Sequence, residues 1–248
     1  MELKAYLDYL VEFIQETVRD AHADGVLVGV SGGIDSAVVA MLAKKAFPDN
    51  YLTCWMPCYS SQKDYECVDE LVKVGDLKTL TVDLATTFDA LTTTIKDQNF
   101  DLSGLATANL KARLRMTTLY GVGQTKNYLV LGTDNADEWY LGYFTKYGDG
   151  GVDVIPLIHL LKGEVKEAAS LLNVPQSIID RKPSAGLWAD QTDENEIGYS
   201  YEAIDHYLLT KSQDNPQLVE RIETLHKNSA HKRKGAIQPL QFERILKK

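Results

Sequence analysis

The chain has 248 residues, of which 44% are hydrophobic and 25% are charged, a composition typical of folded globular proteins. The formal net charge of −9 argues against a general nucleic-acid binder, since such proteins carry a basic surface. No apolar run approaches a membrane span, the acidic N-terminal segment is unlike a signal peptide, and three cysteines without a C-x-x-C pair indicate a reducing compartment. We therefore expect a cytoplasmic protein that binds neither membranes nor nucleic acid.

Short apolar runs alternate with amphipathic segments along the first 160 residues. Helices are predicted at 3–18, 33–47, 61–75, 85–97 and 104–120. Strands are predicted at 26–31, 51–57, 77–83, 128–133 and 152–157. After residue 160, helical patterns follow at 163–172, 194–209 and 216–229. The order predicts an α/β fold with a doubly wound, parallel, five-stranded sheet flanked by helices, and a helical C-terminal extension, all in one domain over residues 1–248.

The segment VSGGIDS (residues 30–36) stands where the first predicted strand meets the following helix. The unpaired N–H groups of a helix start attract anions, and Gly32 and Gly33 let a phosphate approach the backbone closely. Ser31 and Ser36 can add hydroxyl donors. The lysine of a Walker loop is missing and the glycine spacing excludes the dinucleotide fingerprint. Asp35 would repel phosphate unless a cation intervened, so we expect Mg²⁺ at this aspartate.

SGGIDS resembles the pyrophosphate-binding motif of the ATP pyrophosphatases, which cleave ATP between the α- and β-phosphates. Segments at 109–116, 132–157, 182–188 and 191–205 resemble signatures of the NAD synthetase family, in that family's order. The resemblance implies a ligase that performs the last step of NAD biosynthesis. The nicotinate carboxylate of deamido-NAD would attack ATP to give an acyl-adenylate and pyrophosphate, and ammonia would then displace AMP. It also implies a homodimer, for which the helix at 104–120 is our candidate interface.

The resemblance assigns roles to individual residues. The expected ATP contacts are Gly29, Val30, Ser31, Gly32, Gly33, Ile34, Asp35, Ser36, Thr133, Lys162 and Ser184. The expected deamido-NAD contacts are Arg113, Lys146, Asp153, His231 and Lys232. Glu138 follows a predicted strand, where ligands of α/β proteins bind, and is expected to share Mg²⁺ with Asp35.

Three of these residues receive a chemical role. Lys162 would supply the positive charge that the loop lacks, acting with Asp35 in catalysis. Asp153 is our candidate to take a proton from ammonium. Arg115 is an alternative to Arg113 that the sequence does not rank. The aromatic residues flanking Lys146 either wall the nicotinate pocket or pack in the core.

The nitrogen donor and two rival functions complete the expectations. Glutamine-dependent relatives carry an additional amidase domain, whereas here a single predicted helix precedes the loop, so free ammonia is the expected donor. Another ATP pyrophosphatase, acting on tRNA or forming GMP, would release pyrophosphate with a different acceptor. A nucleotide-binding module would bind ATP without turnover, but the retained Asp35 and Glu138 pair argues against it.

Overall fold

The computed structural model describes residues 2–183 and 193–239, so the predicted ATP contact Ser184 lies outside the described residues. Four parallel strands form the sheet in the order β3-β2-β1-β4. They are β1 (Gly25–Val30), β2 (Tyr51–Trp55), β3 (Thr79–Thr81) and β4 (Tyr128–Leu131). Strands β2 and β3 are added on one side of β1 and β4 is added on the other, so the order in which strands join the sheet reverses between β1 and β4. Ligands of open α/β sheets bind at such a switch point.

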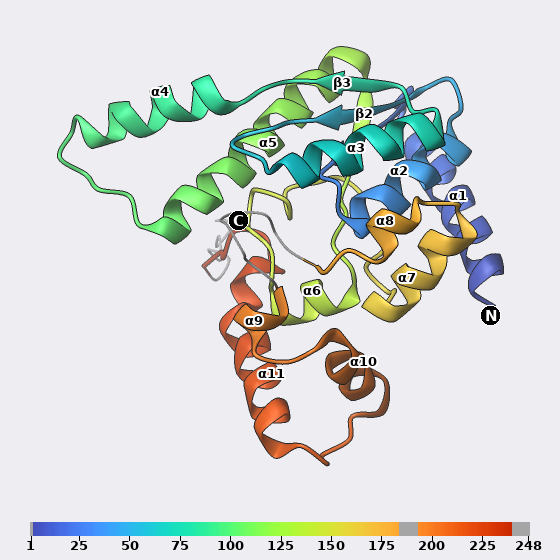
Figure 1. Ribbon diagram of the computed structural model, residues 1–248, viewed down its shortest axis with the longest axis vertical. Helices are drawn as coiled ribbons and strands as arrows, with labels where there is room; N and C mark the ends of the chain where they lie inside the picture. The colour runs from blue at the N-terminus through green and yellow to red at the C-terminus, as the bar shows by residue number, and fades with distance from the viewer. Residues whose placement is uncertain (1, 184–192, 240–248) are drawn as a thin grey trace, which may run out of the picture.

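Helices cover both faces of the sheet, as the doubly wound prediction requires (Figure 1). One face carries α1 (Leu3–Asp20), α2 (Ile34–Ala46), α3 (Gln62–Gly75), α7 (Lys162–Leu171) and the short α8 (Gln176–Ile179). The other face carries α4 (Ala85–Lys96) and α5 (Gly104–Lys126). Strand β1 serves both cores through its alternating side chains: Val26 and Val28 pack with the first set, and Leu27 packs with the second. Figure 1 shows α4 and the beginning of α5 projecting from the body as an arm.

A third apolar cluster holds the C-terminal helices together. It joins α6 (Ala136–Leu141), α9 (Asp193–Ile197), α10 (Tyr201–Thr210) and α11 (Pro216–Asn228), and a 3₁₀ turn (Ala230–Lys232) follows. Among the described residues no helix is both long and apolar enough to traverse a bilayer.

The predicted fifth strand at 152–157 is the main difference from expectation. This segment forms only a single parallel bridge, between Leu131 and Val154. The N–H of Val130 donates to the Asp153 carboxylate at 2.8 Å, so a side chain takes the place of a backbone acceptor. Pro156 has no N–H to extend a ladder. The described part of the sheet therefore has four strands.

The predicted helix at 194–209 is interrupted. Gly198 has φ +93°, which ends α9, and Ser200 accepts a hydrogen bond from the Ala203 N–H to begin α10. Helices α6 and α8 were not expected, and α5 continues six residues past its predicted end, to Lys126, where Asn127 adopts a left-handed conformation.

Candidate active site

The glycine loop follows β1 and is shaped by its own serines. The Ser36 hydroxyl lies 2.9 Å from the Gly33 carbonyl, to which it donates, and 3.1 Å from the Ser31 N–H, which donates to it. Ser31 is exposed, whereas Ser36 is buried. Gly32 has φ +79°, a backbone conformation that favours glycine. The buried Ser36 side chain therefore fixes the conformation of the loop, while the Ser31 side chain and the Gly33 backbone lie at the loop surface.

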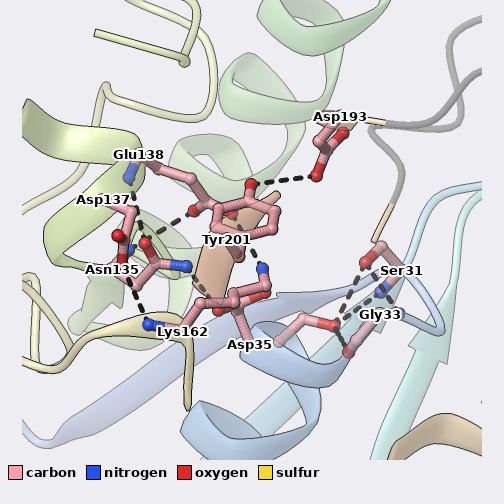
Figure 2. A network of polar contacts seen from close by, with 10 residues as sticks. Ser31, Gly33, Asp35, Asn135, Asp137, Glu138, Lys162, Asp193 and Tyr201 are labelled. Carbon is pink, nitrogen blue, oxygen red and sulfur yellow. Dashed lines mark hydrogen bonds and ion pairs between the residues drawn. The ribbon is translucent and has the colours of Figure 1, made fainter. Parts of the chain in front are cut away.

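A buried lysine joins two carboxylates beside this loop (Figure 2). Nζ of Lys162 lies 2.6 Å from Oδ2 of Asp35 and 3.0 Å from Oε1 of Glu138. Asp35 lies in the first turn of α2, Glu138 in the first turn of α6, and Lys162 opens α7. The three side chains are 8–15% exposed. The structure therefore brings together the two predicted metal ligands and the lysine predicted to supply the positive charge that the loop lacks, at the β1–β4 switch point.

Burial and charge act in opposite directions on the ionisation of this cluster. Burial alone would lower the pKa of Lys162, but the carboxylates of Asp35 and Glu138 outweigh it and raise the pKa, so the lysine is an ammonium ion. Burial raises the pKa of Glu138 to about 7, and the neighbouring Lys162 opposes that rise. The ring of Tyr201 covers the ammonium with its centroid at 4.9 Å. The Tyr201 hydroxyl donates to Asp193 at 3.2 Å.

Asn135 is a central residue that sequence reasoning missed. It is fully buried, and its side-chain amide donates to Oδ1 of Asp35 at 2.8 Å. Its Oδ1 accepts from the Glu138 N–H at 3.0 Å, and its own N–H donates to Oε2 of Glu138 at 3.4 Å. This is a capping box, and the N-x-x-E spacing that produces it is visible in the sequence. Asn135 thereby fixes Asp35 and Glu138 relative to each other.

Two further aspartates, also missed, hold the first turn of α7. The Lys162 N–H donates to Oδ2 of Asp137 at 2.8 Å, and the Gly163 N–H donates to Oδ2 of Asp205 at 2.9 Å. The remaining oxygens, Oδ1 of each aspartate, are buried and accept no hydrogen bond from a described donor. Burial and the adjacent Asp205 raise the pKa of Asp137 to about 8.

The residues expected to bind deamido-NAD divide into a linked group and one separate residue. Arg113 donates to the Lys146 carbonyl at 3.3 Å, and Lys146 donates to the His231 carbonyl at 2.7 Å. Lys232 donates to the carbonyls of Gly142 and Phe144, both at 2.7 Å. These contacts gather Arg113, Lys146, His231 and Lys232 around the loop that follows α6.

Asp153 is held at the edge of β4. Its two oxygens accept hydrogen bonds from the Tyr120 hydroxyl and the Val130 N–H, both at 2.8 Å. Thr133 lies in the turn between β4 and α6, which places it close in sequence to the Asn135 cap. Thr133 therefore follows the carboxyl end of β4, whereas Asp153 lies beside the strand itself.

The two arginines that the sequence left unranked occupy different environments. Arg113 is exposed on α5. Arg115 is partly buried, its Nε donates to the Met56 carbonyl at 3.2 Å just after β2, and no described carboxylate lies within ion-pair distance. Burial lowers its pKa, and Cys58 and Asp149 oppose that change.

The aromatic residues near Lys146 mostly pack within the protein. Trp139 and Phe144 stack with ring centroids 4.9 Å apart, and Tyr140 stacks on His226 at 4.0 Å. Tyr143 is hydrogen-bonded to Glu196. Tyr147 is the exception, because it is 55% exposed. The packing interpretation therefore fits four of the five predicted aromatic residues, and leaves the exposed Tyr147 available to a ligand.

Comparison with known proteins places this geometry in a family. The family model described as NAD synthase matches residues 6–236. A relative from Mesoplasma florum, named NH(3)-dependent NAD(+) synthetase, is 59% identical over 98% of this chain and 100% of its own length. Among solved structures, an NMN synthetase from Francisella tularensis has a TM-score of 0.91 at 39% identity, covering 97% of this chain and all of its own. An NH3-dependent NAD synthetase from Campylobacter jejuni has a TM-score of 0.78 at 31% identity, covering 98% and 100%. By the extent of the family match and the identity to these relatives, the chain belongs to the NAD synthase family.

Proposed function

We propose that the chain is an ammonia-dependent ligase that converts deamido-NAD and ATP to NAD, AMP and pyrophosphate. The observation that carries the proposal is the convergence of Asp35, Glu138 and Lys162 beside a glycine loop, at the switch point of the sheet. The family membership and the names of its nearly full-length relatives support the acceptor and the nitrogen donor. We further propose that residues 1–248 act as one domain, and that the enzyme works in the cytoplasm, as its three unpaired, buried cysteines suggest.

The reaction divides into two steps whose charges the site can accommodate. The nicotinate carboxylate attacks the α-phosphorus of ATP, the α–β bond breaks, and pyrophosphate leaves. The Gly33 N–H donates to the Ser31 hydroxyl at 3.2 Å, and both groups would turn to the phosphates when ATP binds. Lys162 would neutralise charge that develops on the leaving group. Ammonia then attacks the acyl carbon, the bond to AMP breaks, and a proton is lost. Ammonium must lose a proton before that attack, and Asp153 remains the predicted acceptor of the ammonium proton.

The carboxylate pair has the donor chemistry that Mg²⁺ prefers. Two anionic oxygen groups converge on a single cation, Lys162, and hard cations bind carboxylate and phosphate oxygens. We propose that Asp35 and Glu138 hold Mg²⁺ when ATP is present. The ion would supply charge neutralisation on the nucleotide phosphates.

We propose a homodimer that uses the arm formed by α4 and α5. Within α5, the predicted interface helix, Leu119 belongs to the protein's own second core cluster, and Leu110 and Leu114 pack against that cluster. Farther along the arm, Phe100 and Leu105 are 67% and 66% exposed. These two apolar side chains are better placed for contact with a second copy.

A mononucleotide acceptor is the second candidate, because the solved structure with a TM-score of 0.91 is named an NMN synthetase. Both acceptors carry the same nicotinate carboxylate, and they differ in the adenylate half. The test supplies ATP, Mg²⁺ and ammonium with either deamido-NAD or nicotinate mononucleotide, and compares kcat/KM. We expect the dinucleotide to be preferred. A preference for the mononucleotide would reverse the assignment, and formation of ADP in place of AMP would refute both candidates. A parallel reaction with glutamine in place of ammonium tests the nitrogen donor.

A further inference from the structure

All four oxygens of the proposed metal-binding pair already accept a hydrogen bond. In Asp35, Oδ1 accepts from the Asn135 side chain at 2.8 Å and Oδ2 accepts from Lys162 at 2.6 Å. In Glu138, Oε1 accepts from Lys162 at 3.0 Å and Oε2 accepts from the Asn135 N–H at 3.4 Å. The oxygens that face each other across the site are both bound to the same ammonium group. A metal ion that binds between them must first displace Lys162.

We propose that Lys162 acts as a built-in counter-ion that keeps divalent cations off Asp35 and Glu138 until ATP arrives. The inference rests on the proposed function, since it takes these two carboxylates as the Mg²⁺ ligands. It adds an order of events: the lysine leaves the carboxylates for the nucleotide phosphates, and the metal takes its place.

Electrostatics gives the reason why the exchange needs the nucleotide. Mg²⁺ binds oxygen at about 2.0–2.1 Å, so an ion between the carboxylates would lie next to the ammonium, and the repulsion would be strong in a partly desolvated site. The ammonium group of Lys162 cannot simply move into solvent, because the residue is 7% exposed and lies under the Tyr201 ring. The phosphates of ATP supply new negative charge on the loop side, where the ammonium can move without losing its counter-charge.

The backbone of Lys162 is fixed while its side chain exchanges partners. The N–H groups of Lys162 and Gly163 donate to Asp137 and Asp205, at 2.8 and 2.9 Å, which anchors the first turn of α7. Only the flexible four-carbon stem of the lysine therefore has to move. By reciprocity, an arrangement that admits metal only with ATP also makes metal strengthen ATP binding.

The experiment measures Mn²⁺ binding to the full chain without nucleotide, using the electron paramagnetic resonance signal of free Mn²⁺. It is performed at about pH 8, where carboxyl groups are ordinarily ionised. Mn²⁺ shares the preference of Mg²⁺ for oxygen ligands. We expect weak binding to the unmodified chain and at least about tenfold tighter binding to Lys162→Met, since a neutral side chain no longer competes with the metal. The Lys162→Arg variant keeps the positive charge and should bind Mn²⁺ as weakly as the unmodified chain does.

Two controls make the result specific. Lys166→Met removes an exposed lysine from the same helix and should leave Mn²⁺ binding unchanged. Adding Asp35→Asn to Lys162→Met should abolish the gain, which shows that the new site is the carboxylate pair. Equal Mn²⁺ affinity in the unmodified chain and in Lys162→Met would overturn the inference, as would tight binding to the unmodified chain. Circular dichroism checks that each variant is folded. The proposed function fails on a different result, the absence of NAD formation with ammonium.

Discussion

Substitution of the two adjacent loop glycines separates the fold of the loop from its ligand-binding role. Gly32 has φ +79°, and a Cβ there would lie 3.1 Å from both the Asp64 carbonyl and the Cys67 side chain. A left-handed alanine costs about 1–2 kcal/mol, and overpacking adds about 1–3 kcal/mol. Reduced freedom of the unfolded chain offsets about 0.4–1 kcal/mol. Gly32→Ala should therefore lower the free energy of unfolding by about 1–5 kcal/mol.

Gly33→Ala is the matched control for the fold. At Gly33 φ is −90°, and a Cβ would meet only the Ser31 hydroxyl, at 3.2 Å. Its stability should stay within about 0.5 kcal/mol of the unmodified chain. Because the added methyl group points into the space that we assign to phosphate, its Kd for ATP should rise about tenfold or more, or about 1.4 kcal/mol.

Urea unfolding followed by tryptophan fluorescence measures the first effect, and calorimetric titration with ATP and Mg²⁺ measures the second. Normal stability of Gly32→Ala would refute the argument from backbone strain. Normal ATP affinity of Gly33→Ala would refute the placement of the phosphates.

Three further predictions concern single side chains. Arg115→Met should raise the Tm, because it removes a partly buried cation that has no ion-pair partner among the described residues. It should also raise KM for deamido-NAD; a lower Tm would make Arg115 structural. Asp205→Ala should lower kcat, because it removes the acceptor of the Gly163 N–H and loosens the first turn of α7, which carries Lys162. Asp205→Asn keeps an acceptor and should retain most of the kcat. An equal loss of kcat in both variants would contradict this positioning role of Asp205. The hydroxyls of Tyr207 and Tyr140 lower the pKa of Glu223, so the stability that this carboxylate contributes is present above the ordinary glutamate pKa and is lost as the pH falls through the lowered value. Glu223→Gln should therefore lose less stability in acid when unfolding is measured as a function of pH. A pH profile identical to that of the unmodified chain would refute this prediction.

The parts of the fold that depend on local pattern could be predicted from the sequence. The loop at 30–36 carries its own turn chemistry, and α7 begins at Lys162, within one residue of the predicted start. The segment predicted as a strand at 152–157 forms only a single parallel bridge, because its apolar alternation does not reveal that the Asp153 side chain accepts the Val130 N–H. The prediction of one helix at 194–209 gave the periodicity more weight than the break at Gly198.

The site could be predicted only in part, for a physical reason. Asp35 and Lys162 lie 127 residues apart in the sequence, and only the family resemblance predicted that both belong to one site. The capping box at Asn135 has a local signal, N-x-x-E, that could have been used. Asp205 and Tyr201 have none, because they reach Gly163 and Lys162 only through the packing of α10 against α7. Such contacts depend on tertiary structure.

The transfer of oxygen from substrate to AMP tests the central claim most directly. Deamido-NAD labelled with ¹⁸O in its nicotinate carboxylate is incubated with ATP, Mg²⁺ and ammonium, and the AMP is analysed by mass spectrometry. If the carboxylate attacks the α-phosphorus and ammonia displaces AMP, one labelled oxygen must appear in each AMP formed with NAD. AMP without label, or ADP and phosphate as products, would contradict the acyl-adenylate mechanism and with it the function proposed for this chain.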